Sequence, residues 1–387
     1  MKVKMGQAFD LQMGKTPSRN VAEYWGGEHK WVSIADIGNA GKYISETKEC
    51  ITDEGISGSG IKIVPKGTVI MSFKLSIGKT AIASEDMYTN EAIMAFIDKG
   101  VYPVDPNYLY HLCCGTDWTA GTNKAVMGLT LNKATLSDKE INLPTFQEQK
   151  EIAEKLDNVD SLINLRQQEH AKLDELVKSR FIEMFGDPMT NPKGWPTCEL
   201  SQHIIFLTSG SRGWAKYFTN EGEYFITIKN VKNCRITLDD VQHIVPPNNA
   251  EAKRTRVQEG DLLISITADL GRTGVVTKEI ANHGGYINQH LTCIRLNQSA
   301  VRSLYVAYYL ESDAGKGQFQ TKNQSAVKAG LNFSSINTLR LMVPPVELQN
   351  TFISFIEQTD KSKLAVKQSL EKLETLKKSL MQQYFGV

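Results

Sequence analysis

Hydrophobic residues recur in two long stretches of the chain with the three- and four-residue spacing of an amphipathic helix. In the first stretch they are Ile152, Leu156, Val159, Ile163, Leu173, Val177 and Met184, and in the second Phe352, Ile356, Val366, Leu370, Leu373, Leu376 and Leu380. Each stretch ends in Phe-Gly, where glycine supplies a left-handed C-cap. The pattern predicts two helices of about 36 residues, each roughly 54 Å long at 1.5 Å per residue.

The segments before these helices carry the short apolar runs of strands. Residues 68–73 and 261–266 are β-rich and bounded by glycine, and residues 31–34 and 224–228 are similar. Asp105-Pro106-Asn107-Tyr108 predicts a helix start, with aspartate as the cap and proline at the first position. Its counterpart is the segment 304–310. Intermixed strands and helices favour an α+β fold with a curved sheet.

The two halves of the chain repeat each other. LPTFQEQ at residues 143–149 returns as VPPVELQ at residues 343–349, without a gap. Upstream, Gly67, Ser72, Gly78 and Thr80 are matched in the same order by Gly260, Ser265, Gly271 and Thr273. The repeat predicts a first head over residues 1–143, a first helix over 144–186, a second head over 187–343 and a second helix over 344–387.

A helix this long with one apolar stripe needs a partner, and the other copy is the nearest one. Because the termini of a compact module tend to lie close together, we expect the helices to pair as an antiparallel coiled coil with a head at each end. Two surface helices packed on separate heads are the alternative. The second head has a lead-in, Gly194-Trp195-Pro196, that the first lacks. We expect the first head to borrow packing from Tyr384-Phe385-Gly386.

Composition excludes several classes of protein. The chain of 387 residues is 41% hydrophobic and 22% charged, as in globular proteins of two domains. It has no run of eighteen apolar residues and no apolar stretch behind its first lysines, so we expect neither a membrane span nor a signal peptide. Its six cysteines form no CxxC pair, which favours reduced thiols in a cytoplasmic protein without structural zinc.

The motifs of catalysis are incomplete. Asp105-Pro106-Asn107-Tyr108 echoes an amino-methyltransferase signature, but Asn107 replaces the second proline and no glycine-rich cofactor loop precedes it. Gly78-Lys79-Thr80 is no P-loop, because Phe73 stands where that loop requires glycine. Glu251-Ala252-Lys253 has a nuclease-like spacing without a convincing acidic partner. We therefore expect no catalytic residue and no metal ligand in this chain.

The order of the modules, the Pro-x-x-x-x-Gln hinge at 144–149 and 344–349, the Phe-Gly helix ends and Gly14-Lys15-Thr16-Pro17-Ser18 resemble the specificity subunit of type I restriction–modification systems. The likeness runs over the full length. It implies two target-recognition domains, each reading one half of a bipartite, asymmetric target in double-stranded DNA. It also implies a helical spacer that docks two methyltransferase (modification) subunits, through which ATP-dependent restriction subunits join.

The same resemblance implies that the chain binds no cofactor. S-adenosylmethionine, ATP and Mg would belong to the partner subunits. The alternative to this interpretation is a coiled-coil scaffold that bridges two protein partners and does not touch DNA.

Matched loops of the two heads supply the candidate DNA contacts. Lysine and arginine suit phosphate or guanine, and asparagine suits adenine. After the central strand they are Lys74 and Lys79, with Arg272 in the second head; before the hinge they are Asn123 and Lys124, with Lys322, Asn323 and Lys328; after Gly14 and Gly210 they are Lys15, Thr16 and Arg19, with Arg212 and Lys216. Arg254 and Arg256 belong to a basic run that the first head lacks. A solvated polar loop is the alternative for each set.

The distribution of charge limits which parts of the chain can contact DNA. The chain carries a formal charge of +1, and only residues 191–343 are basic, with 17 Lys and Arg against 12 Asp and Glu. Any contact with DNA must therefore come from local basic loops. The loops differ between the heads, which predicts an asymmetric target whose bases the side chains alone do not identify.

Overall fold

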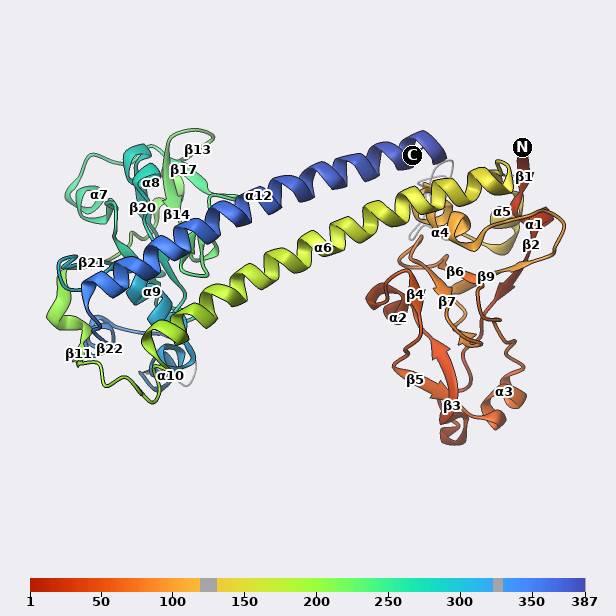
Figure 1. The fold of residues 1–387 in the computed structure, drawn as a ribbon, viewed down its shortest axis with the longest axis horizontal. Helices are drawn as coiled ribbons and strands as arrows, with labels where there is room; N and C mark the ends of the chain where they lie inside the picture. The colour runs from red at the N-terminus through yellow and green to blue at the C-terminus, as the bar shows by residue number, and fades with distance from the viewer. Residues whose placement is uncertain (119–130, 323–329, 387) are drawn as a thin grey trace. The chain divides into compact units, whose positions relative to one another are not determined.

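The computed structural model describes residues 1–118, 131–322 and 330–386 (Figure 1). The chain divides into two compact units, each of which contains one head and parts of both long helices. Unit 1 comprises Met1–Gln168 and Lys367–Val387, and unit 2 comprises Glu169–Val366. Each unit has a hydrophobic core of its own.

In unit 1 the head is built on a five-stranded sheet with the order β2-β9-β6-β7-β4, beside a three-stranded sheet with the order β5-β3-β8. Strands β1 and β10 form a separate antiparallel ribbon. The strands are β1 (Lys2–Lys4), β2 (Phe9–Met13), β3 (Trp25–Val32), β4 (Tyr43–Ile44), β5 (Glu49–Ile51), β6 (Val69–Ser72), β7 (Thr80–Ala83), β8 (Tyr88–Thr89), β9 (Ile93–Asp98) and β10 (Glu140–Asn142). The helices of this head are α1 (Met5–Ala8), η1 (Ala22–Tyr24), α2 (Ile34–Asn39), α3 (Asp53–Ser59), α4 (Pro106–Gly115) and α5 (Lys133–Asp138).

In unit 2 the head has a four-stranded sheet with the order β12-β21-β18-β19 and a second with the order β13-β17-β14-β20. Two ribbons, β11-β22 and β15-β16, complete it. The strands are β11 (Thr197–Glu199), β12 (Ile204–Ser209), β13 (Phe218–Thr219), β14 (Glu223–Ile226), β15 (Val231–Lys232), β16 (Arg235–Ile236), β17 (Gln242–Ile244), β18 (Leu262–Ser265), β19 (Thr273–Val275), β20 (Gly285–Ile287), β21 (Leu291–Leu296) and β22 (Arg340–Met342). The helices are η2 (Leu200–His203), η3 (Trp214–Tyr217), η4 (Ile228–Asn230), α7 (Ala250–Thr255), α8 (Lys278–His283), α9 (Ser303–Glu311), α10 (Asp313–Lys322) and α11 (Phe333–Asn337).

The predicted α+β class and the duplication are both confirmed. Strands β6 and β18 match the apolar runs 68–73 and 261–266, and every residue of both strands is buried. The runs 31–34 and 224–228 end as strands earlier than predicted, because Ser33 and Thr227 begin a helical turn in each head. Asp36 accepts the backbone N–H of Ser33 (2.8 Å), and Asn230 accepts that of Thr227 (3.0 Å).

The predicted helix start at Asp105 is also confirmed. Helix α4 begins at Pro106, and the Asp105 carboxylate accepts the backbone N–H groups of Asn107 (2.9 Å) and Tyr108 (3.0 Å). This arrangement satisfies two amide groups that the first turn of a helix leaves without partners. The aspartate is therefore a capping residue.

Helices α6 (Phe146–Phe185) and α12 (Val346–Phe385) each contain 40 residues, slightly more than predicted, and each is roughly 60 Å long at 1.5 Å per residue. Both end as expected, at Gly186 with φ of 80° and Gly386 with φ of 73°. At the start of α6, the carboxylate of Glu148 accepts hydrogen bonds from the hydroxyl and the backbone N–H of Thr145 (both 2.8 Å). These hydrogen bonds lower the pKa of Glu148.

Within each unit the two helices run antiparallel. In unit 2, the ring centroids of Phe185 and Phe352 are 5.4 Å apart, and Asp174 pairs with Lys363. Residues later in α12 therefore contact residues earlier in α6. In unit 1, Asp160 pairs with Lys377 (2.6 Å) in the same register. The prediction for Leu376, a member of the apolar stripe, is wrong, because this residue is 46% exposed. Its counterpart in α6, Leu176, is 48% exposed.

A buried glutamine joins each long helix to its head. In unit 1, Gln149 accepts the backbone N–H of Asp105 (2.9 Å) and donates to the carbonyl oxygens of Pro103 and Pro144 (both 3.0 Å). Gln349 repeats this in unit 2, where it accepts from Arg302 (2.8 Å) and donates to Pro344 (2.8 Å). Both glutamines are fully buried. The Pro-x-x-x-x-Gln motif is thus the joint between head and helix.

The expectation that the first head borrows packing from the end of the chain is confirmed within unit 1. The Phe385 ring lies 5.5 Å from that of Tyr108, and its side chain also approaches Gly115. In unit 2 the equivalent pair is Phe185 and Tyr305, 4.8 Å apart. Burial raises the pKa of Tyr108 to about 12, so the phenol stays protonated and donates to the carbonyl oxygen of Asn142 (2.8 Å).

Candidate nucleic-acid interface

The loops after β6 and β18 have the same hydrogen bonds. In the first head, Gly78 N donates to Ser72 O (2.9 Å), and Lys79 N donates to Ser72 Oγ (3.0 Å). In the second head, Gly271 N donates to Ser265 O (3.0 Å), and Arg272 N donates to Ser265 Oγ (2.9 Å). The repeat therefore preserves the backbone of this loop, and with it the positions from which Lys79 and Arg272 project.

Left-handed backbone positions shape both loops. Leu75 and Ala268 have φ of 62° and 59°, and Gly78 and Gly271 have φ of 88° and 80°. Both loops adopt a backbone conformation that is unfavourable for leucine and alanine, which indicates that surrounding contacts stabilise it. Gly271 also lies against the Phe319 ring, which leaves no room for a Cβ atom.

The side chains of these loops differ. Leu75 is 89% exposed at the tip of the first loop, Lys74 lies 5.2 Å from the Phe73 ring, and Lys79 is exposed. In the second loop, Arg272 forms an ion pair with Asp269. The two heads thus carry different charges on one backbone framework.

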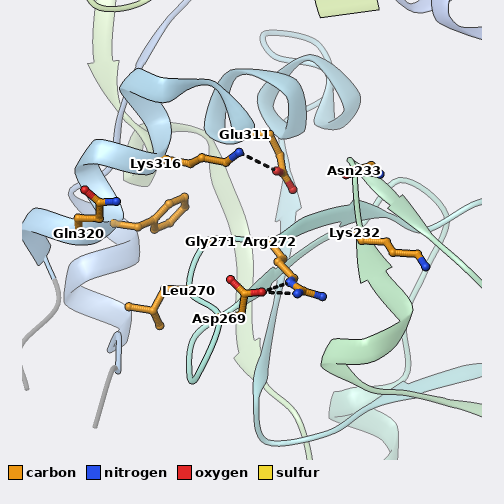
Figure 2. Close-up of a pocket in the computed structure, with 10 residues that line it drawn as sticks. Lys232, Asn233, Asp269, Leu270, Gly271, Arg272, Glu311, Lys316 and Gln320 are labelled. Atoms are coloured by element: carbon orange, nitrogen blue, oxygen red, sulfur yellow. Dashed lines mark hydrogen bonds and ion pairs between the residues drawn. The ribbon is translucent and has the colours of Figure 1, made fainter. Parts of the chain in front are cut away.

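A groove of about 620 Å³ opens beside the second loop. Its lining includes Lys232, Asp269, Arg272, Glu311, Lys316 and Gln320. Figure 2 shows the Arg272–Asp269 pair in the middle of the groove, with Lys232 on one wall and the Lys316–Glu311 pair on another. Nothing in the repeat indicated Lys232 or Lys316 as site residues, because neither has a basic counterpart in the first head.

The loops after Gly14 and Gly210 are held by close backbone packing. A Cβ atom at Gly14 would lie 2.1 Å from the carbonyl oxygen of Thr89, and one at Gly210 would lie 2.1 Å from that of Asn288. No side chain fits there, which is why glycine stands at both positions. The basic residues that follow these glycines therefore start from equivalent places.

In the first head most of these candidates already have partners. Lys15 donates to the carbonyl oxygen of Ser59 (3.2 Å), and Thr16 donates to the carboxylate of Glu91. Arg19 pairs with Glu49 (2.5 Å) and lies 3.8 Å from the Trp25 ring. This pairing raises the pKa of Arg19 and gives the residue a structural role in the loop.

In the second head the four candidate cations are exposed, and two of them have polar partners. Arg212 is exposed, and Lys216 lies 5.0 Å from the Tyr217 ring. Arg254 donates to the carbonyl oxygen of Ser209 (3.0 Å), and Arg256 pairs with Glu223 (3.1 Å).

The candidates before the hinge are only partly described. Asn123, Lys124, Asn323 and Lys328 lie outside the described residues. Lys322, at the end of α10, donates to Thr338 Oγ1 (2.7 Å). The structure therefore brings Arg272 to a groove but assembles no single site from all the predicted residues.

Groups suited to catalysis are engaged in packing. Burial raises the pKa of the Cys113 and Cys293 thiols, so neither is a ready nucleophile. All six cysteines are unpaired. Across residues 1–118, 131–322 and 330–386, no three His, Cys, Asp or Glu side chains are placed to hold a metal ion. In the same residues, no helix is both long enough and apolar enough to span a bilayer.

Comparison with known proteins identifies relatives of both heads. The model of the type I restriction modification DNA specificity domain matches residues 1–175 and 198–376. The MjaIX specificity subunit of Methanocaldococcus jannaschii is 30% identical over 249 residues, which cover 59% of this chain and 57% of that one. The StySPI specificity subunit of Salmonella potsdam is 22% identical over 308 residues, 73% of this chain and 65% of that one. The matched regions thus span less than two thirds of both relatives.

Solved structures show the same fold. A chain from a study of complex assembly and conformational transition of the type I R-M system aligns with a TM-score of 0.65 at 19% identity, covering 100% of this chain and 97% of that one. The S subunit of a type I restriction-modification system from M. genitalium aligns with a TM-score of 0.51 at 14% identity, covering 100% and 96%.

Proposed function

Because the chain belongs to the family of type I restriction modification DNA specificity domains, we propose that it selects the DNA sequence for a type I restriction–modification complex. Each head would read one half of a bipartite, asymmetric target in double-stranded DNA. One observation carries this proposal: Lys79 and Arg272 project from loops with identical backbone hydrogen bonds, next to different neighbours. A shared framework with different side chains suits two readers of different half-sites.

We propose that the chain itself is not catalytic. Asp105 caps α4, and Glu251 accepts the indole N–H of Trp214 (3.3 Å), so both residues of the incomplete motifs have structural partners. S-adenosylmethionine, ATP and Mg would be bound by the partner subunits.

Two methyltransferase subunits would dock on the long helices. Leu176 in unit 2 and Leu376 in unit 1 are equivalent in the repeat, and both are about half exposed, at 48% and 46%. An exposed leucine at the same position of each helix suits two copies of one apolar partner surface. The restriction subunits would join the complex through these methyltransferases.

Footprinting of the complex with methyltransferase subunits tests DNA recognition. We expect two protected segments separated by an unprotected spacer. Protection of one continuous site would contradict the bipartite target.

Charge reversal separates the proposal from a scaffold that does not bind DNA. We expect Lys79→Glu and Arg272→Glu each to weaken DNA binding at least tenfold, because each replaces a cation with an anion near phosphate. Lys66→Glu and Lys278→Glu reverse exposed lysines outside the matched loops and serve as controls. Unchanged DNA affinity in all four variants would favour the protein scaffold.

Native mass spectrometry tests the docking surface. Leu176→Glu and Leu376→Glu should each remove one methyltransferase subunit, and the double variant should remove both. Because both side chains are exposed, the substitutions should leave the fold intact. Full occupancy in the double variant would place the docking surface elsewhere.

A further inference from the structure

The groove beside loop 266–272 of the second head has an excess of positive charge. Lys232, Arg272 and Lys316 face two carboxylates, Asp269 and Glu311. The Glu311 carboxylate is held in place, because it accepts hydrogen bonds from the backbone N–H (2.9 Å) and the hydroxyl (3.3 Å) of Thr273. Asp269 has no such anchor on its carboxylate and is 57% exposed. It is the acidic group of the groove that is free to give up its partner.

The polar groups around Arg272 have capacity left for a ligand. In the described part of the chain, no carboxylate lies within ion-pair distance of Lys232, and the Gln320 amide has no hydrogen-bond partner. Lys316 reaches Glu311 only at 3.8 Å. These groups are all hydrogen-bond donors, and they surround a guanidinium whose partner is an exposed carboxylate.

The first head lacks this arrangement. Ser76 stands at the position of Asp269, and Gly38 stands at the position of Lys232, five residues after the equivalent turns that begin at Ser33 and Thr227. The Lys79 side chain lies over Gly38, where a Cβ atom would come within 2.6 Å of its Nζ atom. The groove is therefore a property of the second head and does not come from the shared framework.

We infer that this groove binds a phosphodiester group of the DNA strand that passes the second head, and that Asp269 holds Arg272 until the DNA arrives. The inference rests on the proposed function. Carboxylate and phosphate present similar pairs of oxygens to guanidinium, so one can replace the other on the same fork of N–H groups. An exposed ion pair contributes little to stability, so the exchange meets little resistance. Lys232 and Lys316 then neutralise the phosphate, and Gln320 donates to a remaining oxygen.

This arrangement gives Asp269 a specific role. Before binding, its carboxylate screens Arg272 and repels phosphate, so a duplex must supply further contacts before Arg272 changes partner. Asp269 would thus lower affinity for DNA that lacks the target half-site. It is a specificity-determining residue that contacts neither base nor phosphate.

The test uses the complex with methyltransferase subunits, a duplex containing the footprinted target and a scrambled duplex. Affinity is measured by fluorescence anisotropy over a range of salt concentrations. Lys232→Gln and Lys316→Gln should each reduce the slope of log K against log salt by about 1, equally for both duplexes. Asp269→Asn should raise affinity for the scrambled duplex about threefold or more while changing target affinity less. Lys278→Gln removes one exposed charge from the same head outside the groove and should leave the slope nearly unchanged.

The outcomes separate the inference from the proposed function. A wild-type complex that binds its target, together with groove variants that behave like Lys278→Gln, would overturn the inference alone. A wild-type complex that binds neither duplex would overturn both. An ATP titration of the DNA-free complex distinguishes the source of the phosphate. ATP binding that Lys316→Gln abolishes, with unchanged DNA slopes, would assign the groove to a free nucleotide and contradict our proposal.

Discussion

The two heads share their central sheet and their loop backbone, but their cores contain different chemistry. In the second head, Asp261 is fully buried and accepts two hydrogen bonds from Arg295, both of 2.8 Å. The first head has Thr68, just before β6, and Ile97 in β9 at these positions. The strand order β2-β9-β6-β7 is nevertheless equivalent to β12-β21-β18-β19. Apolar strands and loop hydrogen bonds therefore fix the framework, and a charged pair in the core is not required for it.

The heads also differ in how their cores are closed. Phe185 is fully buried among Phe181, Tyr305 and Phe352. Phe385, its counterpart in unit 1, is only partly buried against Tyr108. The same position in the repeat thus contributes unequally to the two heads.

Truncating this phenylalanine should have the largest effect on stability, and the loss should differ between the two heads. We expect Phe185→Ala to lower the free energy of unfolding of the second head by about 4 kcal/mol, because a large buried ring leaves a cavity. Phe385→Ala should cost the first head about 2 kcal/mol, because its ring is partly exposed. Hydrogen exchange followed by mass spectrometry resolves the peptides of each head. Equal losses in the two heads would contradict the difference in burial.

Disrupting the ion pair between Asp261 and Arg295 should destabilise the second head, whereas the matched change in the first head should have little effect. Asp261→Asn leaves the Arg295 guanidinium without its charge partner, and we expect a loss of about 3 kcal/mol. Thr68→Val is the matched change in the first head and should alter its stability by less than about 1 kcal/mol. Chemical denaturation with probes in each head would report both values. A small loss in Asp261→Asn would show that water replaces the carboxylate.

Replacing the buried glutamine of each head tests whether the two heads are joined to their helices equally strongly. Gln149→Ala and Gln349→Ala each leave a buried backbone N–H and two carbonyl oxygens without partners. We expect each variant to lose about 2 kcal/mol in its own head. Local hydrogen exchange at the start of α6 and α12 measures this directly. A difference larger than the error between the two variants would show that one joint has a substitute partner.

The smallest expected effect is a dependence on pH confined to the first head. The His111 ring is buried and lies 2.8 Å from the Asp157 carboxylate, which also pairs with Lys42 (2.6 Å). In the second head, a tyrosine, Tyr308, stands at the position of His111 on the equivalent helix.

Burial lowers the pKa of His111 below its ordinary value of 6.5. The unfolded chain therefore takes up the proton first as the pH falls, so the stabilisation is present above pH 6.5 and is lost as the pH falls below it. We expect the first head to lose stability between pH 7 and pH 5.5. His111→Gln should flatten this profile, measured by denaturation at each pH. An equal pH dependence in both heads would contradict the assignment to His111.

Much of the fold was predictable from local patterns. The helices α6 and α12, their Phe-Gly ends and the cap at Asp105 follow from periodicity and capping chemistry, which depend on neighbouring residues in the sequence. The packing of Phe385 on the first head followed from the antiparallel pairing of the helices, which returns the end of α12 to that head. The sheet orders were not predictable, because strand pairing joins distant residues whose apolar patterns are alike.

The candidate site was predictable only in part. Matching the two heads located the loops of Lys79 and Arg272, because the repeat preserves their glycines. It did not find Lys232 and Lys316, since a groove specific to one head leaves no trace in a repeat. The ion pair of Arg19 with Glu49 was equally hidden, because the two residues meet only through the pairing of β3 and β5. The misplaced Leu376 shows that an apolar spacing does not distinguish a helix seam from an exposed position.

The contact between Phe385 and Tyr108 has a consequence for biosynthesis. Tyr108 leaves the ribosome before α6, the second head and α12, whereas Phe385 is the last residue of α12 and follows the rest of these elements. The first head must wait with an incomplete core while the second already has all its parts. A premature stop codon within the codons of α12 would therefore damage the first head, although that head is encoded far upstream of the stop.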